Sequence, residues 1–223
     1  MPSHLIVFDL DGTLVDSRRD LARSANLLLT EHGAAPLAVE EVTAMVGEGA
    51  RVLVRRVLTA AGLVDTVDVQ SALDRFLAIY DEHLLDETRI YPGIEEVLHA
   101  IDGRAALALL TNKPTHHTVR MLADLGIRPR FGEVIGGDGA FARKPDPAGL
   151  LHLVASAGVP PGRTVMVGDS MVDVETARRA GTRVCVARYG FGHLPDDLAG
   201  APGLMEARDP ADLAPLLLDF LQA

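Results

Sequence analysis

Short apolar runs that alternate with helical patterns constrain the fold of this chain most strongly. Each run is rich in branched residues and ends at polar or glycine residues, as buried strands do. The runs cover residues 5–8, 105–110, 133–135, 164–167 and 183–186. Helical patterns lie between the later runs, at residues 94–101, 116–125, 148–157 and 173–180. This order predicts an α/β fold, a doubly wound parallel sheet with helices on both faces, which binds ligands at the carboxyl ends of its strands.

The stretch between the first two runs is far longer than a normal crossover connection. It contains three apolar stripes at helical spacing. The stripes are Leu21, Ala25, Leu28 and Leu29; Val52, Leu53, Val57 and Leu58; and Ala72, Leu73, Phe76, Leu77 and Tyr80. We therefore expect a helical cap domain at residues 16–85, inserted into a core domain of residues 1–15 and 86–223. Polar segments at residues 16–19 and 86–92 are its predicted hinges.

Composition excludes several classes of partner. The 223 residues carry a formal net charge of −10 and only 4% aromatic side chains. An acidic chain repels phosphate backbones and anionic lipids, so we expect no nucleic acid or membrane partner. No apolar run is long enough to span a bilayer, and the single cysteine, Cys185, lies in an apolar run and is expected to be buried. These features favour a cytoplasmic protein, monomeric or homodimeric, that binds a small molecule.

Acidic side chains follow two of the predicted strands. Asp9 and Asp11 come directly after the first run, before Gly12, and Asp169 and Asp173 follow the run at residues 164–167. Close carboxylates repel each other unless they share a cation or a proton, and Mg²⁺ is the simplest occupant. The alternatives are an ordinary Asp-Gly turn and, for Asp173, a helix cap.

Lysine is rare in this chain and falls at two strand ends. Of 21 basic residues only Lys113 and Lys144 are lysines, and they follow the second and third runs. A compact ammonium group is therefore favoured at these positions. The alternative is a coincidence of two surface lysines in loops.

Taken in order, four segments resemble the motifs of the haloacid dehalogenase superfamily. They are Asp9-Leu10-Asp11-Gly12-Thr13, Thr111-Asn112, Lys144-Pro145, and Gly168-Asp169 with Asp173. The resemblance implies a Rossmann-like core with an inserted helical cap and a phosphoryl transfer to Asp9, with Asp11 as general acid and base. It implies that Thr111 and Lys144 hold the phosphoryl oxygens. It also implies that Mg²⁺ is held by Asp9, the carbonyl of Asp11 and Asp169, with Asp173 acting through water.

Further stretches narrow the expected reaction. Asp11 is not needed by a dehalogenase, the cap has no lysine for Schiff-base chemistry, and Leu21 stands where β-phosphoglucomutase-like isomerases place a histidine. Residues 9–17, 46–50, 111–115, 134–138 and 189–190 resemble the bacterial phosphoglycolate phosphatase branch. That resemblance implies hydrolysis of 2-phosphoglycolate, a small phosphorylated metabolite. The substrate contacts expected on this basis are Thr13, Gly47, Arg51, Asn112 and Lys113.

Three alternatives stay open at this point. Phosphatases for sugar phosphates or pyrophosphate have similar motifs, an isomerase of the β-phosphoglucomutase type shares the catalytic set, and a non-catalytic binding protein could keep the fold alone. Arg51 could also be a solvated charge on a helix rather than a contact for a substrate carboxylate.

Overall fold

The computed structural model describes residues 2–192, 194–195, 198 and 204–222. Its main sheet has the strand order β5-β4-β1-β6-β7-β8, and every neighbouring pair of strands is parallel. The strands are β1 (Leu5–Phe8), β4 (Ala106–Leu110), β5 (Glu133–Ile135), β6 (Thr164–Gly168), β7 (Arg183–Ala187) and β8 (Leu204–Ala207). The predicted α/β fold with a doubly wound parallel sheet is confirmed.

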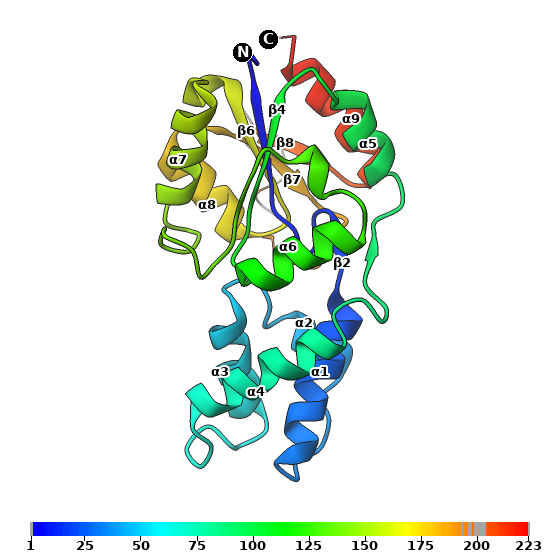
Figure 1. The fold of residues 1–223 in the computed structure, drawn as a ribbon, viewed down its shortest axis with the longest axis vertical. Coiled ribbons are helices and arrows are strands. Elements are labelled where there is room, and N and C mark those ends of the chain that lie inside the picture. The colour runs from blue at the N-terminus through cyan, green and yellow to red at the C-terminus, as the bar shows by residue number, and fades with distance from the viewer. Residues whose placement is uncertain (1, 193, 196–197, 199–203, 223) are drawn as a thin grey trace.

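Helices cover both faces of this sheet, as Figure 1 shows for α7 and α8 on one side and α5 and α9 on the other. Their bounds are α5 (Ile94–Ile101), α6 (Thr115–Asp124), α7 (Ala148–Ala157), α8 (Met171–Ala180) and α9 (Pro210–Phe220). Side chains of a strand point alternately to the two faces, so Leu5 and Val7 join the apolar cluster under α7 and α8, whereas Ile6 and Phe8 join the larger one. Cys185 is fully buried in the larger cluster, as expected, and burial raises the pKa of its thiol to about 12.

The last strand and helix were not predicted from the sequence. Strand β8 is short and only partly buried, so its apolar signal is weak. Helix α9 contains Pro215, and an internal proline normally argues against a helix. The helix is nevertheless held by Asp209, whose carboxylate accepts a hydrogen bond of 2.9 Å from the N–H of Ala211, and by its buried apolar face.

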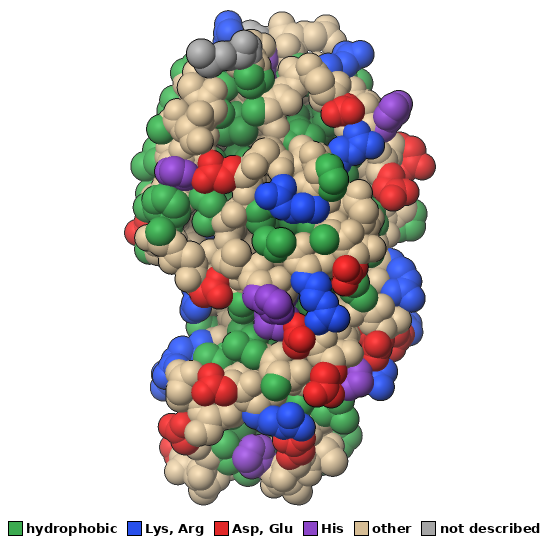
Figure 2. All heavy atoms as spheres, in the orientation of Figure 1, with side chains coloured by type: hydrophobic (Ala, Val, Ile, Leu, Met, Phe, Trp, Pro, Cys, Tyr) green, Lys and Arg blue, Asp and Glu red, His purple; other side chains and the backbone are tan. Residues whose placement is uncertain are grey.

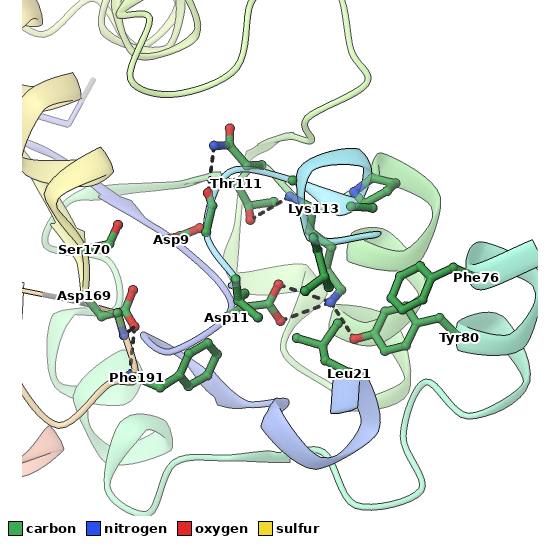
Figure 3. A pocket seen from close by; sticks show the side chains of 18 of the residues that line it. Asp9, Asp11, Leu21, Phe76, Tyr80, Thr111, Lys113, Asp169, Ser170 and Phe191 are labelled. Carbon is green, nitrogen blue, oxygen red and sulfur yellow. Dashed lines mark hydrogen bonds and ion pairs between the residues drawn. The ribbon is translucent and has the colours of Figure 1, made fainter. Parts of the chain in front are cut away.

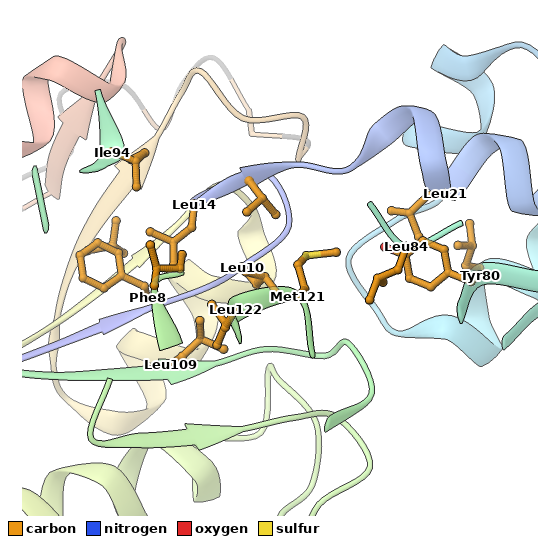
Figure 4. Close-up of a cluster of buried hydrophobic side chains, with 14 of the residues drawn as sticks. Phe8, Leu10, Leu14, Leu21, Tyr80, Leu84, Ile94, Leu109, Met121 and Leu122 are labelled. Carbon is orange, nitrogen blue, oxygen red and sulfur yellow. The ribbon is translucent and has the colours of Figure 1, made fainter. Parts of the chain in front are cut away.

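Four helices form a separate layer beyond the carboxyl ends of the strands, the lower part of Figure 1. They are α1 (Arg18–Glu31), α2 (Val39–Thr43), α3 (Ala50–Ala60) and α4 (Val69–Glu82). Most residues of the three expected apolar stripes are buried, while Val52, Leu73 and Leu77 are half-buried. The larger apolar cluster runs without interruption from Phe8 in the sheet to Tyr80 in these helices (Figure 4). The short helix α2 was not predicted.

The chain leaves the sheet layer and returns to it through neighbouring segments. Strands β2 (Val15–Asp16) and β3 (Arg89–Ile90) pair antiparallel, so the two predicted hinge segments lie side by side. The buried carboxylate of Asp20 accepts N–H groups from Glu87 and Thr88 at 2.7 to 3.0 Å and the Thr88 hydroxyl at 2.7 Å. These bonds fasten the start of α1 to the returning segment.

The surface carries charges of both signs. In the space-filling view, acidic and basic side chains are interspersed over the face shown (Figure 2). Among the described residues, no helix combines the length and the apolar character needed to cross a membrane. On the face shown in Figure 2, the acidic side chains are not gathered in one block.

We expect Asp20→Ala to lower the free energy of unfolding by about 3 kcal/mol, because one part-buried donor on Glu87 and two buried donors on Thr88 lose a charged acceptor. Urea unfolding followed by circular dichroism measures this difference. The exposed Asp65 provides the control, and Asp65→Ala should change the value by less than about 0.5 kcal/mol. Equal stabilities of the two variants would contradict a fastening role for Asp20.

Candidate active site

Neighbouring strands bring the predicted motifs to one edge of the sheet. Strand β1 lies between β4 and β6, and the N–H of Asp9 donates to the carbonyl of Val167 at 2.8 Å. A pocket opens at this edge between the sheet and the helices α1, α3 and α4 (Figure 3). The lining residues that matter below are Asp9, Asp11, Leu21, Gly47, Tyr80, Thr111, Asn112, Lys113, Asp169 and Phe191.

A buried ammonium group lies beside Asp9 at the edge of the pocket, although Lys144 itself is not among the residues that line it. Lys144 Nζ lies 2.9 Å from Asp9 Oδ1 and 2.6 Å from Asp173 Oδ1, and the lysine is only 3% exposed. Burial opposes a charge on this lysine, but the carboxylates of Asp173 and Asp9 outweigh that effect and raise its pKa. Lys144 is therefore a cation at any pH near neutrality, and Asp9 is held in a fixed place beside it.

Carboxylates outnumber this one ammonium group. Oxygen atoms of Asp9, Asp169 and Asp173 lie within 4.8 Å of one another. Burial, followed by the charges of its neighbours, raises the pKa of Asp169. Burial also raises the pKa of Asp9 to about 6, with Asp173 adding to the shift and Lys144 opposing it. A buried cluster with excess negative charge and only oxygen ligands fits a hard divalent cation.

Two carboxylates of this cluster are oriented by further hydrogen bonds. Asp169 Oδ2 accepts the N–H groups of Phe191 at 3.0 Å and Gly192 at 2.7 Å. Asp173 Oδ2 accepts the hydroxyl of Ser170 at 2.7 Å, at the start of α8. Asp173 thus caps a helix, as one reading of the sequence suggested, and it also pairs with Lys144. With both oxygens engaged, it suits an indirect role at a metal ion better than a direct one.

The carboxylate of Asp11 is separate from this cluster. It accepts the Ser17 hydroxyl at 2.6 Å and faces Lys113, whose Nζ lies 3.1 Å from each of its oxygens. The same ammonium group is 2.6 Å from the hydroxyl of Tyr80 on α4 (Figure 3). The two aspartates of the first motif therefore have different surroundings, Asp9 with Lys144 and Asp11 with Lys113.

Asn112 joins the sheet layer to the helical layer. Its side-chain amide donates to the carbonyls of Gly47 and Lys144, both at 2.9 Å. The loop containing Gly47 also approaches closely at Gly49, where a side-chain carbon would lie 3.2 Å from the Asn112 carbonyl oxygen and the φ angle is +94°. Thr111, which precedes Asn112 in the chain, is 4% exposed and lines the pocket. Asn112 is thus a structural link between layers in addition to a pocket residue.

Two expected substrate contacts are not where the sequence suggested. Arg51 lies on the outer side of α3, donates to the side chain of Gln70, and does not line the pocket. The helix turns it outward because Ala50 and Leu53 occupy the inner face. Thr13 is also outside the pocket, since the turn after Asp11 buries its side chain completely. Gly47, Asn112 and Lys113 do line it.

Sequence reasoning missed three residues that shape the site. Ser17 binds Asp11, Phe191 supplies a backbone donor to Asp169, and Tyr80 binds Lys113. Tyr80 was assigned only to an apolar stripe, because helical spacing predicts burial and says nothing of its hydroxyl. The hydroxyl of a buried tyrosine usually has a hydrogen-bond partner, so a tyrosine in an apolar stripe could have indicated a polar contact at this position.

With this geometry in place, comparison with known proteins identifies the class of the chain. Residues 6–187 match the family model described as haloacid dehalogenase-like hydrolase. The chain belongs to this family, and the resemblance inferred from its four motifs is confirmed.

Individual relatives are similar over most of their length. A phosphoglycolate phosphatase of Pseudomonas putida is 40% identical over 206 residues, which are 90% of this chain and 75% of the relative. A phosphoglycolate phosphatase of Rhodospirillum rubrum is 42% identical over 202 residues, 88% of this chain and 84% of the relative. A crystal structure described as a predicted phosphoglycolate phosphatase from Haemophilus somnus superposes with a TM-score of 0.88 at 32% identity, covering 96% of this chain and 97% of the other.

We expect Gly190→Ala to weaken binding of a divalent cation by at least about tenfold, as loss of outer-shell support does in metal sites. A side-chain carbon at this position would lie 2.3 Å from the Gly12 carbonyl oxygen and 2.4 Å from Asp169 Cβ, so the Asp169 carboxylate has to move. The measurement is the rise in melting temperature on titration with Mg²⁺. Gly162→Ala is the control, since nothing lies within 4 Å of its added carbon, and an unchanged response of both variants would refute the expectation.

Cation binding should also depend on pH through Asp9. Its pKa of about 6 means that the carboxylate holds a proton below that pH, and a proton competes with a metal ion for the same oxygens. The apparent affinity for Mg²⁺ should therefore fall as the pH is lowered from 7.5 to 5, by up to about tenfold per pH unit below 6. Melting temperatures with and without Mg²⁺ at several pH values measure this. An affinity that stays constant over the range would count against Asp9 as a ligand.

Proposed function

We propose that this chain is a Mg²⁺-dependent phosphatase that hydrolyses 2-phosphoglycolate to glycolate and phosphate through a phosphoryl intermediate on Asp9. The observation that carries the proposal is the placement of Asp9 at the pocket edge, 2.9 Å from the buried ammonium group of Lys144, with a second carboxylate, Asp11, held apart from it. The phosphoglycolate phosphatases that are about 40% identical to this chain support the choice of substrate.

The two aspartates divide the chemistry between them. A carboxylate oxygen of Asp9 attacks phosphorus, the bond from phosphorus to the ester oxygen breaks, and Asp11 gives its proton to that departing oxygen. In the second half, water attacks the phosphoryl group on Asp9, Asp11 takes a proton from this water, and phosphate leaves with Asp9 restored. Each carboxylate has its own ammonium partner, Lys144 for Asp9 and Lys113 for Asp11, so the two groups are held in separate places for their separate tasks.

Charge is the main obstacle when a carboxylate attacks a phosphate group. Lys144 and the hydroxyl of Thr111 hold phosphoryl oxygens and offset the repulsion, which matters most in a pocket that excludes water. Asp9, the Asp11 carbonyl and Asp169 would hold Mg²⁺, with Asp173 in support. When bound, the ion supplies further positive charge and aligns the phosphoryl group with Asp9.

The pocket is suited to a small, acidic substrate. Its volume is about 60 Å³, which favours a small substrate. Lys113 is the cationic side chain among its described lining residues, and we assign to it the carboxylate of 2-phosphoglycolate in place of Arg51. Leu21 adds an apolar wall where an isomerase would need a group that handles protons.

A panel of phosphate esters tests this proposal. With Mg²⁺ present, kcat/KM for 2-phosphoglycolate should exceed that for a hexose phosphate and for pyrophosphate by at least about tenfold. Asp9→Asn should lower kcat by at least about a thousandfold, because an amide is not a nucleophile, while Asp65→Asn leaves kcat unchanged. Released phosphate is the readout. A preference for another ester would overturn the substrate, and full turnover by Asp9→Asn would overturn the mechanism.

A further inference from the structure

The ammonium group of Lys113 bridges the two layers of the molecule. On the sheet side it lies 3.1 Å from both carboxylate oxygens of Asp11, and on the helical side it lies 2.6 Å from the hydroxyl of Tyr80. The Lys113 side chain is only 3% exposed. Its position is therefore fixed by one partner in the turn after β1 and one in α4.

Tyr80 is itself rigidly placed. Its ring stacks against Phe76 with centroids 5.9 Å apart and packs at a tilt of 32° against His117 of α6 at 5.5 Å, and Lys113 Nζ lies 4.5 Å from the ring centroid. Burial raises the pKa of Tyr80, so the phenol keeps its proton. Tyr80 thus presents a neutral hydroxyl and an aromatic face to the Lys113 ammonium group, and packing against Phe76 and His117 holds its ring in place.

Buried ammonium groups need hydrogen-bond partners, because water cannot supply them. Three N–H donors are available on Lys113, and a single carboxylate does not fix the direction of a flexible four-carbon chain. The hydroxyl of Tyr80 provides a second fixed point. Since Tyr80 belongs to α4, this point exists only while the helical layer is in contact with the sheet layer.

We propose that Tyr80 is a positioning residue that sets the Lys113 ammonium against Asp11 only when the helical layer is closed over the pocket. The proposal rests on the function proposed above and deepens it. The Lys113 ammonium, the Asp11 carboxylate and the Tyr80 hydroxyl then share one fixed arrangement in the closed pocket, so turnover is coupled to closure.

Tyr80→Phe tests the proposal, because it removes the hydroxyl and keeps the aromatic packing and the ring under Lys113. We expect kcat to fall about tenfold with 2-phosphoglycolate and by the same factor with p-nitrophenyl phosphate, which has no carboxylate, while KM changes less than about twofold. A loss confined to 2-phosphoglycolate would mean that the hydroxyl acts on the substrate carboxylate, directly or through Lys113, and not on the arrangement of Lys113 with Asp11, and an unchanged kcat would mean that the hydroxyl does nothing. Both results overturn the proposal.

A double-mutant comparison separates positioning from general destabilisation. In a Lys113→Met background, Tyr80→Phe should have no further effect on kcat, whereas independent, multiplicative losses would contradict action through Lys113. Tyr91→Phe is the matched control, since the buried Tyr91 hydroxyl has no hydrogen-bond partner among the described residues, and its kcat should equal that of the unmodified chain. Urea unfolding of each variant reports its stability.

The unmodified chain keeps the two proposals apart. If it cleaves p-nitrophenyl phosphate but not 2-phosphoglycolate, the substrate assignment fails. The effect of Tyr80→Phe on kcat is then measured with p-nitrophenyl phosphate and still tests the positioning role. If it cleaves neither ester, the proposed function fails, and the positioning role, which depends on it, fails as well.

Discussion

The ion pairs of Lys144 with Asp9 and Asp173 hold the functional edge of the sheet together. They join segments that follow three different strands, β5, β1 and β6, around one ammonium group that is almost inaccessible to water. An ion pair on the surface contributes little to the free energy of unfolding. Removal of one partner from a buried network leaves an uncompensated charge and lowers that free energy by several kcal/mol. Because Asp173 also caps α8, the position of the Lys144 loop and the start of that helix belong to one network.

Much of this arrangement could be predicted from the sequence, because its signals are local. Branched apolar runs mark strands that are buried on both faces, and polar residues directly after such runs must lie at the ligand-binding edge of a parallel sheet. Asp9, Lys144 and Asp169 were found in this way, Thr111 was found through the resemblance to the family motifs, and all four lie at that edge. The rarity of lysine was also informative. Both lysines of the chain are buried beside carboxylates at this edge.

The parts that could not be predicted depend on contacts between distant segments. The pairing of Tyr80 with Lys113 joins helix α4 to the loop after β4, and no periodic pattern contains it. The expected contact of Arg51 with the substrate was wrong, because closeness in sequence to the glycine loop does not determine which side of α3 a residue occupies. Leu53 lies on the buried side of this helix, and Arg51 instead binds Gln70. Helix α9 was missed because the burial of Leu213 and Leu217 outweighs the local cost of Pro215.

The antiparallel pairing of β2 with β3 has a consequence for how such enzymes can be altered. The chain enters the helical layer after β2 and leaves it before β3, and these two strands pair with each other. The two ends of the helical layer therefore lie side by side. A chain insertion with closely spaced ends places little strain on its host. The sheet layer can therefore accept a different helical layer grafted at this ribbon, provided that the graft supplies the hydroxyl that Tyr80 offers to Lys113 and an apolar face that continues the shared core.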